Sequence, residues 1–224
     1  MPTKSLLGRK AAGSTIKKMK ATLSRERVLK TAAQVFAEKG YAGTTMRVVA
    51  ERAGLQAGSL YYHYRSKEEL IEAVLSMGLR GVADSVRLAV AAVPENASAR
   101  ELIDTAIIAH LTSLLEYGDY ALASRRLLGQ VPPRIRRKHI DLRDEYGDFW
   151  LALLETALGS GELRPGVDLH LARAFTLGAL NYALEWYRPG GKPLEEIGSE
   201  FSLMICDGIF SRRLSDRPFL PIVN

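Results

Sequence analysis

Side chains that can hydrogen-bond to nucleic acid are concentrated between residues 44 and 67 of this 224-residue chain. The segment TTMRVVAERAGLQAGSLYYHY carries hydroxyl, guanidinium, amide and imidazole groups, and an ammonium group follows at Lys67. Such groups at helix ends bond well to phosphate oxygens, and Arg and Gln can also pair with the edges of guanine and adenine. This part of the sequence is therefore suited to contacts with a nucleic acid.

Two short helices are predicted to position these groups. Thr44 or Thr45 can cap the first helix, and Gly54 supplies the residue that ends it. The second helix is predicted to start near Gln56. Two helices this short and this close are typical of a helix-turn-helix, whose second helix can enter the major groove. The alternative is an ordinary pair of packed helices, which does not explain the aromatic run at residues 61–64 beside many basic residues.

The flanking sequence extends this pattern. An apolar repeat with helical spacing predicts a further helix from Ser24 that ends at Gly40. Over about residues 24–75 the chain resembles the DNA-binding domain of the TetR family of bacterial regulators. The resemblance rests on the order Phe-x-x-x-Gly-Tyr, Thr-Thr, Ala-x-x-Ala-Gly, Gly-Ser-Leu-Tyr-Tyr-His and Lys-x-x-Leu. Gln56 and Ala57 depart from it, since most relatives have a small hydroxyl residue and often a polar residue there.

The resemblance and the side-chain chemistry together predict two groups of DNA contacts. Phosphate contacts are predicted from Thr44, Thr45, Tyr61, Tyr62, His63 and Lys67. Groove contacts are predicted from Arg47, Gln56 and Ser59, and Gly58 is expected to let the second helix lie close to the DNA backbone. Tyr62 can instead pack on the preceding helix. A capping box of Ser66 and Glu69 is expected to start the next helix.

Positive charge is concentrated in the N-terminal part of the chain. Residues 1–64 contain 12 Lys and Arg against 3 Glu, whereas the rest of the chain contains 19 basic and 22 acidic side chains. This asymmetry is expected of a DNA-binding face. Residues 1–22 are predicted to form a disordered basic arm, which either adds phosphate or minor-groove contacts or is simply solvated.

The overall composition, 47% hydrophobic and 25% charged, is that of a globular protein. No apolar run approaches the roughly 20 residues that span a bilayer, and the N-terminus lacks the apolar segment of a secretory signal. We therefore expect no membrane association. The single cysteine, Cys206, fits the reducing conditions of a cytoplasmic location and is expected to be a small core residue.

The rest of the chain has helical periodicity throughout and none of the alternation typical of strands. Helices are predicted near residues 67–92, 98–117, 120–128, 134–158, 168–187 and 194–212. The fold class is therefore all-α, with about nine helices. We predict a three-helix helix-turn-helix domain at 23–68, a helical effector-binding and dimerisation domain at 69–213, and a tail at 214–224.

The last two predicted helices are too apolar to lie uncovered. The helix from Leu169 to Tyr187 is apolar nearly all round, and its successor carries an apolar stripe that includes Phe201 and Met204. A four-helix bundle between two chains, the TetR-like arrangement, would cover both helices. The alternative is a monomer with these helices in its own core. A homodimer would present two recognition helices to the half-sites of a pseudo-palindromic operator.

The resemblance further implies an effector cavity in the second domain, whose filling shifts the protein toward a form that cannot bind DNA. The aromatic candidates for lining it are His110, Tyr146, Phe149, Trp150, Tyr182 and Trp186, although each can equally be plain core. A basic cluster is the other candidate component: Arg125, Arg126, Arg134, Arg136, Arg137, Lys138 and His139. This cluster can instead be a solvated helix face.

Two segments, RLLGQVPPRIR and NYALEWYRPGGKPLEE, are similar to those of a TetR subgroup that controls fatty-acid, sterol or other acyl-CoA catabolism. This similarity implies an acyl-CoA thioester as the effector, which needs an apolar tunnel and cations such as Arg125 for its phosphates.

An enzymatic function has no support in the sequence. The four histidines are dispersed, and there is no HExxH, no CxxC and no Gly-rich phosphate loop. No nucleophile, base and orienting group come together, and no metal or cofactor is implied. We predict a dimeric, ligand-responsive repressor that a small hydrophobic effector releases from DNA. The alternative is a constitutive DNA-binding or architectural protein without a small-molecule switch.

Overall fold

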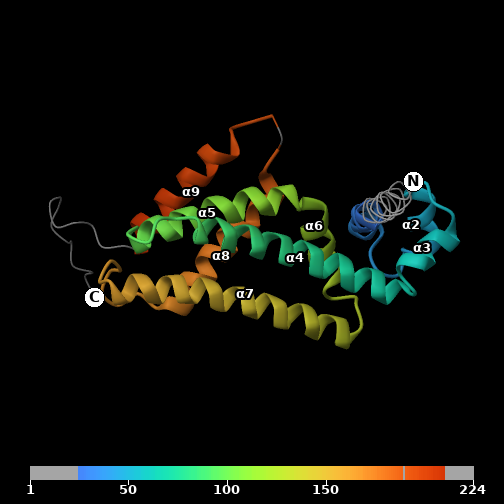
Figure 1. Cartoon of the computed structure of the whole chain (residues 1–224), viewed down its shortest axis with the longest axis horizontal. Helices are drawn as coiled ribbons and strands as arrows, with labels where there is room; N and C mark the ends of the chain where they lie inside the picture. Colours follow the sequence, from blue (N-terminus) through green and yellow to red (C-terminus); the bar gives the residue numbers. More distant parts are fainter. Residues whose placement is uncertain (1–24, 189, 210–224) are drawn as a thin grey trace, which may run out of the picture. The chain divides into compact units, whose positions relative to one another are not determined.

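The computed structural model describes residues 25–188 and 190–209, which are mostly helical (Figure 1). The first helix covers residues 25–39. It is followed by α2 (Met46–Arg52), α3 (Ala57–His63), α4 (Lys67–Ala91), α5 (Ala99–Glu116), α6 (Gly118–Leu127), α7 (Pro133–Gly159), α8 (Leu169–Trp186) and α9 (Leu194–Ile209). These nine helices within the described ranges confirm the predicted all-α fold class. The predicted arm at 1–22 and tail at 214–224 lie outside the described residues.

The chain packs as two compact units. Of the described residues, 25–78 and 119–139 form one unit, and 79–118, 140–188 and 190–209 form the other. Helices α4 and α7 each run without interruption through parts of both units. These units are defined by packing. The domains predicted from the sequence, 23–68 and 69–213, are defined by function, and their boundaries remain a prediction.

The first unit has a core to which distant segments contribute. Phe36 of the first helix, Leu60 of α3 and Ile71 of α4 are fully buried. The same cluster contains Leu127 at the end of α6 and Ile135 in the first turn of α7. The helix-turn-helix therefore packs against the 119–139 segment as well as against its sequence neighbours, which extends the three-helix arrangement expected from the sequence.

Local signals set the helix ends of the first unit. Gly40 (φ 69°) and Gly54 (φ 67°) adopt the left-handed conformation that favours glycine and end the helices before them, as predicted. Thr45 caps α2, because its hydroxyl oxygen accepts from the Val48 N–H at 3.2 Å. The predicted capping box at Ser66 is only half formed. The Glu69 N–H donates to Ser66 Oγ at 3.1 Å, but the Glu69 carboxylate accepts from the Arg65 N–H, one residue earlier than expected.

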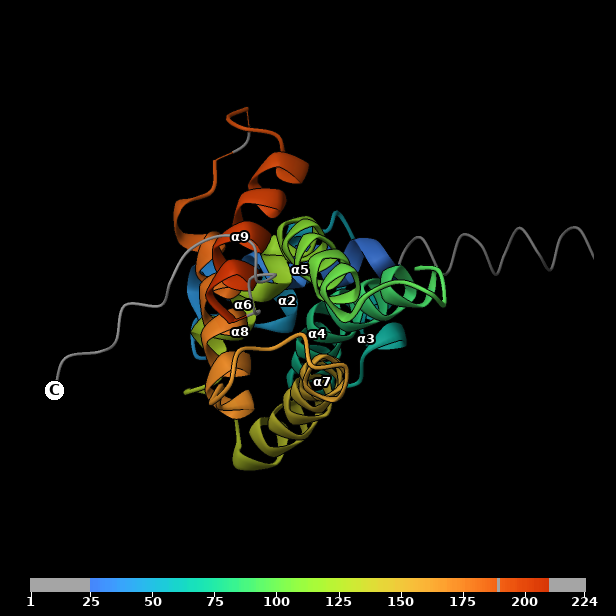
Figure 2. The same ribbon diagram turned by 90° about the vertical axis from the view of Figure 1, so that its left-hand side faces the viewer.

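The second unit is built on α5, which packs against α8 and α9 (Figure 2). The predicted capping box at the start of α5 is confirmed. The Glu101 N–H donates to Ser98 Oγ at 3.2 Å, and the Glu101 carboxylate accepts from the Ser98 N–H at 2.7 Å. Asp168 caps α8 by accepting from the Leu171 N–H at 3.0 Å, also as predicted.

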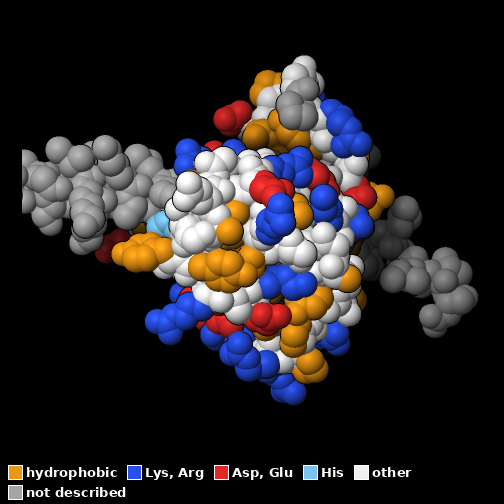
Figure 3. All heavy atoms as spheres, turned by 90° about the vertical axis from the view of Figure 1, so that its right-hand side faces the viewer, with side chains coloured by type: hydrophobic (Ala, Val, Ile, Leu, Met, Phe, Trp, Pro, Cys, Tyr) orange, Lys and Arg blue, Asp and Glu red, His pale blue; other side chains and the backbone are white. Residues whose placement is uncertain are grey.

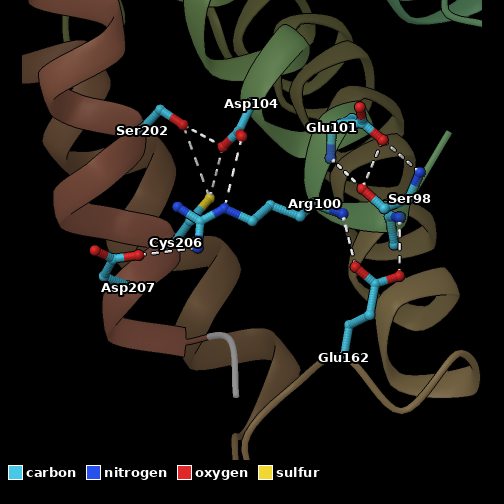
Figure 4. A network of polar contacts seen from close by, with 9 residues as sticks. Ser98, Arg100, Glu101, Asp104, Glu162, Ser202, Cys206 and Asp207 are labelled. Carbon is cyan, nitrogen blue, oxygen red and sulfur yellow. Dashed lines mark hydrogen bonds and ion pairs between the residues drawn. The ribbon is translucent and has the colours of Figure 1, made fainter. Parts of the chain in front are cut away.

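A polar network joins α5 to α9 (Figure 4). The Asp104 carboxylate accepts from Ser202 and, at 3.1 Å, from the Cys206 thiol. Arg100 approaches Asp104 at 3.7 Å and pairs with Asp207 at 2.9 Å. Burial and then the Asp104 carboxylate raise the pKa of the Cys206 thiol to about 12. Cys206 is therefore a buried, un-ionised side chain, in agreement with its predicted core position.

Within the described residues, no helix has the length and apolar character to cross a membrane. In the same residues, His, Cys, Asp and Glu side chains nowhere gather in a group of three that could hold a metal ion.

Candidate nucleic-acid interface

Helix α3 exposes nearly all of its side chains. Of its seven residues only Leu60 is buried, and Leu60 attaches the helix to the core of the first unit. Tyr61 is 51% exposed and Tyr62 is 86% exposed. Tyr62 therefore does not pack on α2, and that alternative is wrong. Tyr64, at the end of the same aromatic run, is instead buried, with its hydroxyl accepting from Arg25 Nε at 3.1 Å.

The groove candidates lie at the exposed start of α3 and on α2. Gln56, Gly58 and Ser59 are all exposed. A methyl group added to Gly58 would meet no described atom within 4 Å, so packing within the chain does not require glycine there. Arg47 on α2 has 85% of its side chain exposed and pairs with Glu51 at 2.9 Å. An exposed pair of this kind contributes only about 0–1 kcal/mol, so the guanidinium can readily turn to another partner.

The two threonines before α2 have different roles. Thr45 is exposed, and the cap uses only a lone pair of its hydroxyl, so the O–H remains a donor. Thr44 is fully buried, and its hydroxyl donates to the Gly40 carbonyl at 2.7 Å. A phosphate contact by Thr44 would break this buried bond. Thr44 is therefore not a phosphate contact in the proposed interface.

Lys67, the first residue of α4, is held by Tyr41. Its ammonium donates to the Tyr41 carbonyl at 2.9 Å and lies 4.0 Å from the centre of the Tyr41 ring. These contacts offset the unfavourable placement of a cation at a helix N-terminus. The Tyr41 hydroxyl donates to Glu68 at 2.7 Å, and this bond lowers the pKa of the Glu68 carboxyl. The sequence analysis did not select Tyr41, although Tyr41 is the last residue of the Phe-x-x-x-Gly-Tyr pattern.

The two units carry opposite net charge. The described residues of the first unit contain 14 Lys and Arg against 7 Asp and Glu, and those of the second contain 8 against 17. Figure 3 views the side of the molecule on which α2 and α3 lie in Figure 1, and there basic side chains are interspersed with hydrophobic and acidic ones. The basic cluster at 125–138, a candidate for effector binding, also belongs to the first unit. Within that unit, Arg134 and Lys138 pair with Glu72 of α4.

Four of the effector candidates form one cluster in the second unit. His110 Nδ1 lies 2.8 Å from the Tyr146 hydroxyl, and their rings are stacked at 5.8 Å. Trp150 meets both rings edge-on, at 6.0 and 6.4 Å, and half-buried Phe149 stacks on Tyr146 at 6.3 Å. His110, Tyr146 and Trp150 are almost completely buried.

This cluster contains unpaired polar atoms. His110 Nε2 and Trp150 Nε1 have no hydrogen-bond partner among the described residues. Burial lowers the pKa of His110 to about 4, so the imidazole is neutral at pH 7. Burial likewise raises the pKa of Tyr146. Buried polar atoms without a hydrogen-bond partner are rare in proteins.

The remaining effector candidates lie elsewhere. Tyr182 is 62% exposed on α8, and Trp186 is partly exposed and stacks on Phe201 at 6.0 Å. Arg125 is exposed in the first unit. The sequence analysis missed two further cations, Arg80 and Arg87, which line a pocket of about 110 Å³ in the second unit together with Leu79, Ala83, Asp84, Leu142 and Glu145.

Comparison with known proteins agrees with this geometry. Residues 28–74 match the family model of bacterial regulatory proteins of the tetR family, and residues 96–209 match the tetracyclin repressor-like C-terminal domain. The chain belongs to the TetR family. It is accordingly a transcriptional regulator with a DNA-binding helix-turn-helix, and not an enzyme.

Its relatives include a regulator named for its role in ketosteroid control. The chain is 30% identical to the HTH-type transcriptional repressor KstR2 of Rhodococcus jostii, over 84% of this chain and 91% of KstR2. The structure of the ketosteroid transcriptional regulator KstR2 of Mycobacterium tuberculosis matches with a TM-score of 0.73 and 26% identity, over 84% of this chain and 95% of that one.

A third protein with the same fold has been solved with its ligands. The structure of AibR in complex with isovaleryl coenzyme A and operator DNA matches with a TM-score of 0.70, over 81% of this chain and 97% of that one. The identity is 22%, so this similarity shows the fold only.

Proposed function

We propose that this TetR regulator is a dimeric cytoplasmic repressor that binds a pseudo-palindromic operator and is released by a small effector. One observation carries the proposal most directly. Helix α3 is attached to its unit through a single buried residue, Leu60, and offers its other side chains to solvent on a unit of net positive charge. A short exposed helix on a basic surface is what entry into the major groove requires.

In this proposal the side chains of the interface, which are exposed except for half-buried His63 and Lys67, divide into two roles. Phosphate oxygens accept from Thr45, Tyr61, Tyr62, His63 and Lys67. Base edges are read by Arg47, Gln56 and Ser59, and Gly58 lets the DNA backbone approach α3. The phosphate contacts set the register of the protein on the duplex, and the base contacts set its sequence preference.

The proposed dimer is supported by apolar side chains that a single chain leaves uncovered. Leu171, Phe175 and Tyr182 are each at least 59% exposed, and their spacing places them on one face of α8. Leu203 and Met204 of α9 are 56% and 65% exposed. The monomeric alternative requires these residues in the chain's own core, where they are not found. A second copy of α8 and α9 would cover them.

The proposed effector site is the buried cluster around His110. Its unpaired atoms belong to a neutral imidazole and an indole N–H, which suit an uncharged polar group such as the carbonyl of a thioester. Arg80 and Arg87 line the pocket in the same unit, and Arg87, which pairs with Glu145 at 3.0 Å, would exchange this carboxylate for an anionic group of the effector. Together with isovaleryl coenzyme A, the ligand of AibR, which shares the fold, these features favour an acyl-CoA as the effector class.

The proposal is tested by selecting palindromic fragments from a random duplex library with the purified protein. Acyl-CoAs, free acids and unrelated hydrophobic compounds are then added to the complexes. Release of the DNA by acyl-CoAs alone supports the full proposal. Release by other compounds only contradicts the effector class. DNA binding without release by any compound, and without a thermal shift, favours the constitutive alternative.

A further inference from the structure

The turn that precedes the helix-turn-helix is held by a residue almost ninety positions away. The Tyr41 N–H donates to Gln130 Oε1 at 2.9 Å. Gln130 is fixed in turn, because its Nε2 donates to the Arg126 carbonyl at 3.0 Å and its backbone N–H to the Leu127 carbonyl at 2.7 Å. Gln130 belongs to the 119–139 segment, which packs into the core of the same unit.

Glycine is required where these two segments meet. Gly40 has φ 69°, and a Cβ there would lie 2.8 Å from Gln130 Oε1. A side chain at position 40 would therefore be strained and would also displace the amide that receives the Tyr41 N–H. The close approach of Gln130 to the turn thus depends on both the conformation and the missing side chain of Gly40.

The position of Tyr41 in turn determines the position of the Lys67 ammonium. The Tyr41 carbonyl and ring hold the Lys67 ammonium at 2.9 and 4.0 Å, and the Tyr41 hydroxyl bonds Glu68 in the same helical turn. Without these contacts the long Lys67 side chain would sample many rotamers, away from the positive end of α4. The Tyr41 turn therefore fixes where the cation at the start of α4 is presented.

We propose that Gln130 and Tyr41 are positioning residues for DNA binding, which act by holding the Lys67 ammonium in place for a phosphate. This inference rests on the proposed function of Lys67. Gln130 lies in the turn between α6 and α7, so the placement of the Lys67 ammonium depends on the position of this turn.

The test measures the affinity of the full-length protein for a 30-base-pair duplex of arbitrary sequence as a function of salt. Phosphate contacts are independent of sequence, and each lost contact lowers the slope of log affinity against log salt by about one. Gln130→Ala is expected to lower affinity about three- to tenfold and to reduce the slope, as Lys67→Ala does. The double variant is expected to bind no worse than Lys67→Ala alone, because both changes remove the same contact.

The control is Gln34→Ala, which removes the 2.9 Å bond to Asp119. That bond also joins the 119–139 segment to the first helix but does not involve Tyr41. Gln34→Ala is expected to leave the salt slope unchanged. Equal slopes for Gln130→Ala and the wild type, or additive losses in the double variant, overturn the proposal.

Hydrogen exchange of the Tyr41 amide in the free protein separates this inference from the proposed function. Faster exchange in Gln130→Ala than in the wild type is expected, and unchanged exchange overturns the inference whether or not DNA binds. Failure of the wild-type protein to bind any duplex at low salt instead overturns the proposed function, and with it the role of Lys67.

Discussion

Two tyrosines on α3 lie on the surface although each could bury a large apolar ring. Tyr61 and Tyr62 are 51% and 86% exposed, so neither ring is buried in the core of the unit. A phenol hydroxyl at the end of a rigid ring is well suited to reach a phosphate at low entropic cost. In the proposed interface, Tyr61 and Tyr62 contribute to DNA binding rather than to the stability of the fold.

Tyr62→Phe is therefore expected to weaken DNA binding without affecting stability. Loss of one hydrogen bond of about 0.5–1.5 kcal/mol corresponds to a decrease in affinity of about 2- to 12-fold. Fluorescence anisotropy with the selected duplex measures the affinity, and thermal unfolding measures the stability. Tyr187→Phe, directly after α8, is the matched control and is expected to change neither. Equal affinities of Tyr62→Phe and the wild type would remove Tyr62 from the interface.

His110 gives the protein a pH-dependent stability. Its pKa is about 4 when folded, below its ordinary value of 6.5, so between these values the unfolded chain binds a proton that the folded chain does not. The free energy of unfolding therefore decreases as the pH falls from about 6.5 to about 4, by up to about 1.4 kcal/mol per pH unit.

Urea unfolding of the wild type and of His110→Phe between pH 4.5 and 7 tests this effect. The stability of the wild type relative to the variant is expected to decrease as the pH falls, because only the wild type carries the histidine. A difference that is independent of pH would show that His110 is not buried in its neutral form.

Helix α9 is attached to α5 in part through the Asp104 carboxylate. Asp104 accepts from Ser202 and Cys206 and lies near Arg100 (Figure 4). Burial and the neighbouring carboxylate together suppress ionisation of the thiol, so Cys206 is a thiol and not a thiolate at pH 8.

Cys206 is therefore expected to react slowly with iodoacetamide in the folded protein and rapidly in urea. Asp104→Asn removes the neighbouring negative charge and is expected to increase the folded-state rate about three- to tenfold, because the pKa of the thiol falls while its burial remains. Mass spectrometry of the alkylated protein gives both rates. Fast alkylation of the folded wild type would contradict the closed contact between α5 and α9.

At the scale of the whole molecule, the exposed apolar face of α8 and α9 predicts a homodimer. Phe175→Glu places a charge in that face and is expected to give monomers. Tight operator binding is expected to be lost, because a monomer has one recognition helix and can bind only one half-site. Sedimentation velocity measures the mass, and a gel shift measures the binding.

Leu88→Glu is the control for the dimer, because Leu88 is 72% exposed on α4. It is expected to leave the mass unchanged. A dimer that persists in Phe175→Glu, or a monomeric wild type, would place the subunit contact elsewhere or remove it.

Local sequence patterns were sufficient to predict most helix boundaries and the helix-turn-helix. Gly40, Gly54, Ser98 and Asp168 act through backbone conformation and hydrogen bonds over three or four residues, so their effects can be predicted without the fold. The family likewise follows from the order of motifs along the chain.

The tertiary structure decided which of these residues are available to a partner. Burial of Thr44, exposure of Tyr62 and the contact between Tyr41 and Gln130 depend on segments that are distant in sequence. The same holds for the packing of residues 119–139 into the DNA-binding unit. No local periodicity encodes such contacts, because burial depends on which surfaces meet after the chain has folded.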